Sequence, residues 1–214
     1  MTLPDPPLLL ITDRKQAVRP LPEMLEGAFA AGCRWASLRE KDLPAAEQIA
    51  MAQDLLPLAR RYNARLTLHG DAATAKAAGT DGVHLSAGGD AAAARSILGP
   101  QALIGISIHT LDEAAKLDAP ILDYAIAGPV FPTASKPGFG PVLGESGLAA
   151  IIRAAAIPVL AVGGISASSV AKMTALGAAG VAVMGAIMRA PDPTREVRGL
   201  LEHLRSTNTK PVTA

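Results

Sequence analysis

A chain of 214 residues, half of them hydrophobic, is long enough to bury the core of one large domain. Its formal net charge is +1 and its charges are scattered, which excludes the basic stripe of a nucleic-acid-binding protein. No apolar run approaches the ~20 residues of a membrane span, which excludes a membrane protein. The amino-terminus lacks a signal-peptide pattern, so the cytoplasm is the expected location.

Apolar segments without many aromatic residues predict helices packed on buried parallel strands. The expected strands are 8–12, 35–39, 65–69, 82–85, 103–107, 124–128, 158–162 and 181–184. The clearest helical patterns are 45–62, 148–155 and 166–176. Ser166 or Ser168 is expected to cap the last of these helices. The single cysteine, Cys33, precedes the second strand and is expected to be a buried structural thiol.

Three passages share one layout, in which an alanine-rich helix ends at a glycine and a strand follows within a few residues. The glycines are Gly32, Gly79 and Gly177, and the second interval is about twice the first. The implied period extends to about eight strand–helix units, which predicts a compact (βα)8 barrel over residues 1–205 and a disordered polar tail over 206–214. The rival is an open doubly wound sheet, but no Gly-x-Gly-x-x-Gly follows the first strand.

Phosphate-binding features follow the last two expected strands, at the end where (βα)8 barrels carry their active sites. Gly163 and Gly164, with the Met184-Gly185 step, would expose backbone N–H groups at helix starts. Glycines also occur in tight turns without any ligand, so both interpretations stay open. Arg39 and Lys41 would add cations that suit a second, more highly charged anion. The alternative for that segment is a solvated turn of mixed charge.

The loop after the sixth strand, residues 128–140, carries chemistry of its own. Thr133 and Ser135 supply hydroxyl groups, Lys136 supplies a cation, and two glycines follow. A loop of this length and composition favours an anion-binding function, although a solvated connector is the alternative.

The four histidines have different predicted roles. His84 alternates with apolar neighbours and is expected to point into the barrel mouth, as a structural or a catalytic group. His69 ends a strand beside Asp71, which permits acid–base or metal chemistry. His109 and His203 are expected to be structural or solvated.

Taken together, these segments resemble the thiamine phosphate synthase and TenI-like superfamily over about residues 8–190. The matching segments are Thr12-Asp13-Arg14, Leu38-Arg39-Glu40-Lys41, Asp81-Gly82-Val83-His84, Gly105-Ile106-Ser107-Ile108-His109-Thr110, Gly128-Pro129-Val130-Phe131-Pro132-Thr133-Ala134-Ser135-Lys136, Val162-Gly163-Gly164-Ile165 and Gly180-Val181-Ala182-Val183-Met184. The resemblance implies a transferase that joins hydroxymethylpyrimidine diphosphate to thiazole phosphate and releases diphosphate, with Mg²⁺ at the leaving group.

The resemblance also implies roles for individual residues. Diphosphate contacts would fall to Arg39, Lys41 and Lys136, and Ser107 would lie close to the reacting centre. The thiazole phosphate would be held by Thr133, Ser135 and the backbone at Gly163, Gly164, Met184 and Gly185. Phosphorylated small molecules are therefore the expected partners, and association into a homo-oligomer is left open.

The chain departs from the synthase pattern at the second, third and fourth strands. Ser37 stands where the family has a pyrimidine-binding Gln, and His69-Gly70 stands where it has Asn-Asp. Asp71 lies one residue late for the first metal carboxylate, and Asp90 supplies the second only if a gap is allowed. The departures keep two alternatives open, a TenI-like thiazole tautomerase and a non-catalytic binder of phosphorylated ligands. Pro129 stands where tautomerases commonly have His.

Overall fold

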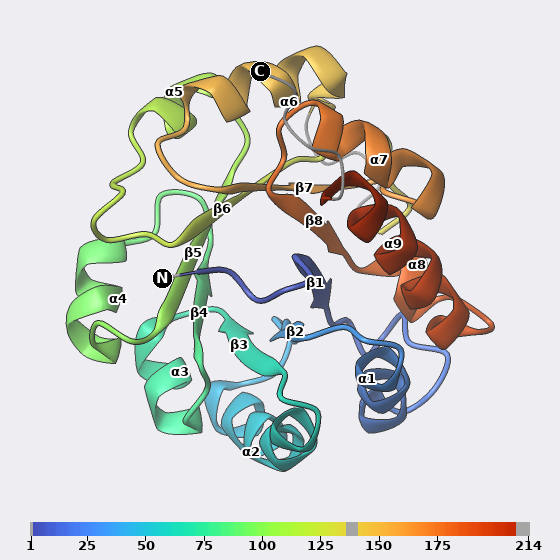
Figure 1. Cartoon of the computed structure of the whole chain (residues 1–214). Helices are drawn as coiled ribbons and strands as arrows, with labels where there is room; N and C mark the ends of the chain where they lie inside the picture. Colours follow the sequence, from blue (N-terminus) through green and yellow to red (C-terminus); the bar gives the residue numbers. More distant parts are fainter. Residues whose placement is uncertain (1, 136–140, 209–214) are drawn as a thin grey trace.

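The computed structural model describes residues 2–135 and 141–208, and its eight parallel strands close into a barrel in chain order. The strands are β1 (Leu8–Ile11), β2 (Trp35–Leu38), β3 (Arg65–His69), β4 (Gly82–Leu85), β5 (Leu103–Ile108), β6 (Tyr124–Ala127), β7 (Val159–Val162) and β8 (Gly180–Val183). The helices are α1 (Leu21–Ala30), α2 (Ala45–Arg61), α3 (Ala72–Ala78), α4 (Ala91–Leu98), α5 (Leu111–Ala115), α6 (Gly144–Ala154), α7 (Ala167–Ala175), α8 (Gly185–Met188) and α9 (Pro193–Asn208). Figure 1 shows the helices arranged around the outside of the barrel.

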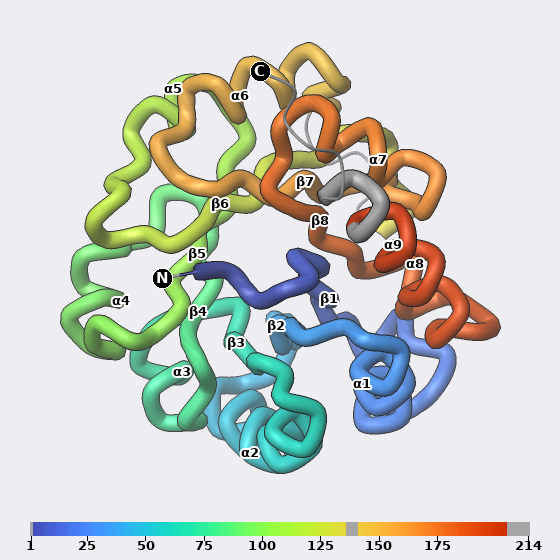
Figure 2. Tube along the Cα trace, viewed as in Figure 1, coloured from blue at the N-terminus to red at the C-terminus, as the bar shows by residue number. Residues whose placement is uncertain are grey.

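The predicted (βα)8 architecture is confirmed, and each predicted strand overlaps an observed one. Closure is made by β1 and β8, where Leu8 is in register with Val181; the two strands run side by side in the trace of Figure 2. One boundary differs from expectation. Residues 206–208, expected in a disordered tail, continue α9, while 209–214 lie outside the described residues. None of the described helices is long and apolar enough to cross a membrane.

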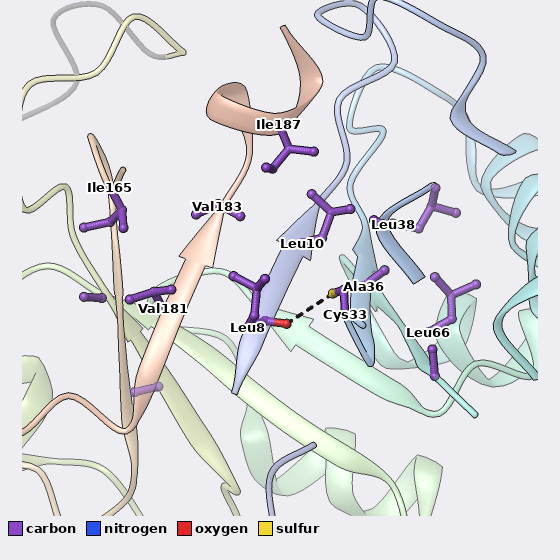
Figure 3. Close-up of a cluster of buried hydrophobic side chains, with 14 of the residues drawn as sticks. Leu8, Leu10, Cys33, Ala36, Leu38, Leu66, Ile165, Val181, Val183 and Ile187 are labelled. Atoms are coloured by element: carbon purple, nitrogen blue, oxygen red, sulfur yellow. Dashed lines mark hydrogen bonds between the residues drawn. The ribbon is translucent and has the colours of Figure 1, made fainter. Parts of the chain in front are cut away.

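Alternation along the strands produces two apolar layers. Leu8 and Leu10 face outward, into the large layer between the barrel and its helices, whereas Leu9 and Ile11 face the barrel interior. Figure 3 shows part of the outer layer, where Cys33 is fully buried and its thiol donates to the Leu8 carbonyl at 3.5 Å. Burial raises the pKa of the Cys33 thiol to about 11, which confirms the expected structural thiol.

The predicted helix-ending glycines adopt the left-handed conformations expected of them. The φ angles of Gly32, Gly79 and Gly177 are 112°, 73° and 96°, a region that side chains with a Cβ rarely enter. Each glycine lets the chain turn at once from a helix into the next strand. Ser166 caps α7, as predicted: it is the N-cap residue, and its N–H donates to Ser169 Oγ at 3.0 Å.

A second repeated device holds the other end of the barrel. Asp81 and Asp123 precede β4 and β6, and each carboxylate accepts a backbone N–H of the preceding strand at 2.8 Å. Asp81 pairs with Arg60 at 2.7 Å and Asp123 pairs with Arg95 at 2.8 Å. Each ion pair thereby connects the start of a strand to a neighbouring helix. These contacts hold the amino-terminal end of the barrel, opposite the end that carries the polar residues.

Candidate active site

A cavity of about 520 Å³ opens at the carboxyl end of the strands, where the site was predicted. The predicted site residues that line this cavity are Arg39, Lys41, His69, His84, Ser107, Thr133, Ser135, Gly163, Gly164, Met184 and Gly185. Ser37 lies below the lining, fully buried on β2, and its Oγ has no hydrogen-bond partner among the described residues. Lys136 lies outside the described residues.

The segment after β2 is folded so that its two cations face the cavity. Glu40, only 2% exposed, accepts a hydrogen bond from Thr12 Oγ1 at 2.7 Å and an ion pair from Arg14 at 3.1 Å. Because Glu40 is anchored on one side, the flanking Arg39 and Lys41 point to the other side and line the cavity. Glu40 is thus buried and Arg39 half-buried, while Lys41 and Asp42 are exposed, and anion binding by this segment stays a prediction.

Lys41 and Arg39 are close enough to affect each other. Burial, together with the charge of Arg39, lowers the pKa of Lys41. Arg39 Nη1 also lies 3.9 Å from the Met184 sulfur, which places Arg39 beside the residue that follows β8. Two neighbouring cations in a partly buried mouth favour an anionic ligand that relieves their repulsion.

A further cation, Arg189, lines the cavity and was missed in the sequence. It follows α8, and its Nη1 donates to Ser135 Oγ at 3.1 Å and to Gln16 Oε1. A Cβ at Gly185 would lie 2.0 Å from Ser135 Oγ and 2.4 Å from Arg189 Nη1, so the glycine makes room for both groups. The spacing could have predicted this position, because Arg189 follows Gly185 by four residues, about one helical turn, which puts the two residues on the same side.

The glycine pair after β7 brings that turn against the loop after β6. Gly163 and Gly164 have φ angles of 97° and 66°. A Cβ would lie 2.7 Å from Pro129 Cα at the first position and 2.7 Å from Phe131 Cβ at the second. The glycines thus have a packing role at the cavity wall, and binding of phosphate by their N–H groups stays a prediction.

The cavity floor contains neutral hydrogen-bonding groups. His84 is fully buried, and its Nε2 lies 2.9 Å from Ser107 Oγ while its Nδ1 lies 3.2 Å from the Tyr124 hydroxyl. Burial, with a smaller effect of Lys41, lowers the pKa of His84 to about 3, so the ring is neutral. The His69 ring lies 4.6 Å from that of His84, centroid to centroid.

His109 also lines the cavity, although it was expected to be structural or solvated. Its Nδ1 lies 2.6 Å from the Gly128 carbonyl oxygen, so it joins the ends of β5 and β6. His203 lies in α9, as expected, with its Nδ1 2.8 Å from the Gly199 carbonyl.

The two predicted metal carboxylates have structural roles at helix starts. Asp71 caps α3 by accepting the Thr74 N–H at 2.9 Å, and Asp90 caps α4 by accepting the Ala93 N–H at 2.9 Å. Neither aspartate lines the cavity. Within residues 2–135 and 141–208, no three His, Cys, Asp or Glu side chains are arranged to hold a metal ion.

Comparison with known proteins gives consistent matches. The family model for thiamine monophosphate synthase matches residues 8–187. A putative thiamine-phosphate synthase of Geobacter sulfurreducens is 45% identical over 196 residues, covering 91% of this chain and 92% of that protein. A thiamine-phosphate synthase of Roseiflexus sp. is 38% identical over 195 residues, covering 89% of this chain and 82% of that protein. Among solved structures, thiamine phosphate pyrophosphorylase from Pyrococcus furiosus is 31% identical with a TM-score of 0.82, covering 94% of this chain and 96% of that chain.

Proposed function

The chain belongs to the thiamine monophosphate synthase family, and we propose that it is a transferase joining hydroxymethylpyrimidine diphosphate to thiazole phosphate with release of diphosphate. One observation carries the proposal. The cavity is lined by Arg39, Lys41 and Arg189, with no carboxylate among the described lining residues. A mouth of this charge favours anionic groups, which both substrates carry.

Arg39 and Lys41 are proposed to hold the diphosphate. When the carbon–oxygen bond of the pyrimidine substrate breaks, diphosphate leaves with the electron pair and a benzylic-type cation remains. Fixed cations beside the leaving group stabilise that separation of charge. The thiazole nitrogen then donates its electron pair to the cation and forms the carbon–nitrogen bond. The proposed part of Lys136 in this step lies outside the described residues.

The other side of the mouth is proposed to hold the thiazole phosphate. Arg189 Nη1 lies 3.1 Å from Ser135 Oγ, and both groups occupy space beside Gly185, the first residue of α8. Thr133, with backbone at Gly163, Gly164 and Met184, completes the proposed set. Since Arg39 also reaches Met184, the two anions would lie on adjacent parts of one rim, with the reacting atoms between them.

The pyrimidine ring is proposed to lie deeper, over neutral groups. Ser107, His69 and His84 line that part of the cavity. Ser37 is buried on β2 outside the cavity lining, and its hydroxyl, which has no partner among the described residues, is proposed to gain a hydrogen bond from a polar atom of the ring. An acid–base role for His69 is retained in the proposal.

Among the described residues, the side chains do not fit a magnesium site built by the protein itself. Both candidate carboxylates, Asp71 and Asp90, cap helices, and neither lines the cavity. Mg²⁺ is commonly bound by substrate phosphates with one or two carboxylates, so a requirement for Mg²⁺ is a proposal to be measured rather than a step of the mechanism.

The deciding experiment is diphosphate release by the full chain from both substrates together, with Mg²⁺ and with a chelator. We expect stoichiometric diphosphate and thiamine phosphate, and Arg39→Ala should lower kcat by about 100-fold, since it removes stabilisation of the leaving group. Arg195→Ala is the matched control, an exposed arginine of α9 away from the cavity.

The same samples should be assayed for isomerisation of a thiazole carboxylate phosphate. Isomerisation without diphosphate release would replace the proposal with the tautomerase alternative. Substrate binding without either reaction would identify a non-catalytic relative, since a shared fold alone does not fix function.

A further inference from the structure

The loop after β1, residues 12–18, lies between the two groups of cations at the cavity mouth. β1 pairs with β2 on one side and with β8 on the other, as Figure 1 shows. Arg39 and Lys41 follow β2, whereas Arg189 follows β8 and the short helix α8. No residue of this β1 loop, all of which is described, lines the cavity. Any effect of the β1 loop on a bound ligand must therefore pass through its neighbours.

Thr12 joins the β1 loop to the segment that carries the first two cations. The N–H of Arg39 donates to Thr12 Oγ1 at 2.9 Å, and Thr12 Oγ1 donates to Glu40 Oε1 at 2.7 Å. A backbone N–H can only donate and a carboxylate can only accept, so both directions are fixed. Thr12 is fully buried and Glu40 nearly so, and water does not compete for either bond. One hydroxyl group thus holds the backbone from which the Arg39 side chain enters the cavity.

The β1 loop also holds the carboxylates of that segment away from the cavity. Arg14 Nη1 lies 3.1 Å from Glu40 Oε2, and Arg14 Nη2 donates to Asp42 Oδ2 at 2.7 Å. Lys15 Nζ pairs with the same Asp42 oxygen at 2.9 Å. Neither carboxylate lines the cavity, whereas both cations of the segment do. The β1 loop thereby leaves a segment of alternating charge with its positive groups toward the cavity.

Farther along, Gln16 joins the β1 loop to the cation on the other side of the mouth. Gln16 Nε2 donates to the Asp13 carboxylate, so the amide oxygen is the end that faces Arg189, and Arg189 Nη1 donates to it. The backbones meet at the same place, where the Val18 N–H donates to the Met188 carbonyl at 3.0 Å. The residue before Arg189 is therefore bound to the β1 loop as well as its guanidinium.

We propose that the β1 loop positions the cations of both anion sites: Thr12 positions Arg39 for diphosphate, and Gln16 positions Arg189 for thiazole phosphate. The inference rests on the proposed function and deepens it, because it names residues outside the cavity lining that determine where each anion is bound. Thr12 and Gln16 touch no ligand themselves and act only through the two arginines. Each of them should therefore affect one ligand and not the other.

The test measures Kd by titration calorimetry on the full chain with two probes, inorganic diphosphate and thiazole phosphate. Thr12→Val removes the hydroxyl with little change of shape. We expect it to raise the Kd for diphosphate about tenfold, the effect of one hydrogen bond, while the Kd for thiazole phosphate changes less than about twofold. Thr12→Ser keeps the hydroxyl and should stay within about twofold of the wild type for both probes. An unchanged Kd for diphosphate in Thr12→Val would overturn the proposal.

Gln16→Ala should show the opposite pattern. It should raise the Kd for thiazole phosphate about threefold, because a half-buried neutral hydrogen bond contributes less, and leave the Kd for diphosphate unchanged. A Kd for thiazole phosphate equal to that of the wild type would overturn the assignment of Gln16. Equal changes for both probes in either variant would show a general disturbance of the mouth and contradict separate positioning.

Thr80→Val and Gln53→Ala are the matched controls. Thr80 Oγ1 lies 3.0 Å from the Gly82 carbonyl oxygen, at the amino-terminal end of β4, and Gln53 Nε2 donates to the Ala77 carbonyl at 3.4 Å from helix α2. Both variants lose a hydrogen bond far from the mouth and should bind both probes as the wild type does. Urea denaturation of every variant shows that it is folded during the titration, so a loss of stability is measured separately from a change in Kd.

The titrations need no turnover, so this proposal and the proposed function can fail separately. A wild-type chain that binds both probes but releases no diphosphate from the two substrates would contradict the transferase and leave the crossed pattern of the variants as evidence for positioning. An active enzyme in which the crossed pattern is absent would overturn the positioning role of the β1 loop alone.

Discussion

The ring of Tyr124 lies directly over the backbone of Gly105, filling the space in which any other residue would carry its Cβ. The two residues are in register on neighbouring strands, β6 and β5. A glycine within a strand usually weakens it, and here it admits an aromatic ring to the barrel interior. The pair sets the position of the hydroxyl beside His84, so one small residue determines the geometry of the cavity floor.

Gly105→Ala should therefore be damaging despite its small size. The new methyl group would lie 2.0 Å from the Tyr124 ring, which would have to move into a packed interior. We expect a loss of about 1–3 kcal/mol in the free energy of unfolding, measured by urea denaturation, together with reduced activity. Gly199→Ala, in helix α9, is the control: its Cβ would lie 3.5 Å from Ala167 of α7, an ordinary van der Waals contact, and the change should raise stability by about 0.5–1 kcal/mol. Equal stability of both variants would contradict the packing argument.

Arg189 should contribute to binding of the phosphorylated thiazole. It has neutral partners, Gln16 and Ser135, and no carboxylate within ion-pair distance among the described residues, so a phosphate would compete well for its guanidinium. Arg189→Ala should raise the KM for thiazole phosphate about tenfold, the worth of one charge-assisted hydrogen bond, with little change for the pyrimidine diphosphate. Arg189→Lys should recover part of the loss, whereas Arg195→Ala should change neither KM. Equal rises in both KM values would show a general electrostatic effect instead.

Folding stability should fall as the pH is lowered from about 6.5 toward 3. The pKa of His84 is lowered to about 3 by burial, so between these limits the unfolded chain binds a proton that the folded chain does not. One proton corresponds to about 1.4 kcal/mol per pH unit, measurable by urea denaturation at pH 7, 6, 5 and 4.5. His84→Gln should flatten the slope in this window. Asp42, whose pKa the Arg14 guanidinium lowers, adds its own loss only at more acidic pH. A slope that persists in the variant would assign the dependence to other groups.

Arg95 should be far more important for stability than an exposed arginine. Its guanidinium pairs with Asp123, whose side chain is 8% exposed, and also donates to the carbonyls of Ile121, Gly99 and Ala102. Arg95→Ala should cost about 3 kcal/mol, because a buried carboxylate loses its cation.

The matched control for Arg95 is Arg61→Ala. Arg61 pairs with Glu26 on the surface, where the two side chains are 60% and 51% exposed. Removal of an exposed pair should cost less than about 1 kcal/mol in the same denaturation assay. Comparable losses for the two arginines would show that burial does not set the value of these ion pairs.

The barrel could be predicted from the sequence because its local signals agree. Glycines such as Gly79 end helices at a regular interval, where the chain adopts a left-handed conformation. The apolar segments between them are too hydrophobic for surface strands and indicate buried ones. The hydrogen bonds that the Asp81 and Asp123 carboxylates accept were not predicted, since each comes from a backbone N–H of another strand. The helix end near residue 208 also escaped prediction, because polar residues are compatible with both a helix end and a disordered tail.

The site could be predicted only where function leaves a local pattern. Arg39 and Lys41 flank Glu40. Because Glu40 is buried on one side of the segment, the two cationic side chains point to the other side, into the cavity. Arg189 directly follows α8 and belongs to no motif, and its place in the cavity depends on the absence of a side chain at Gly185. The contact of the Tyr124 hydroxyl with His84 was not predicted, because the two residues lie on different strands, β6 and β4.

The contact between Arg39 and Met184 joins residues 145 positions apart in the chain, and it exists because β1 pairs with β8. A chain in which β1 and β8 were unpaired would lack this contact between the residues that follow β2 and β8. If inorganic diphosphate binds at the proposed rim, its binding should require the closed barrel. A ligand that binds only the folded chain stabilises it, so the midpoint of unfolding should rise with the concentration of diphosphate.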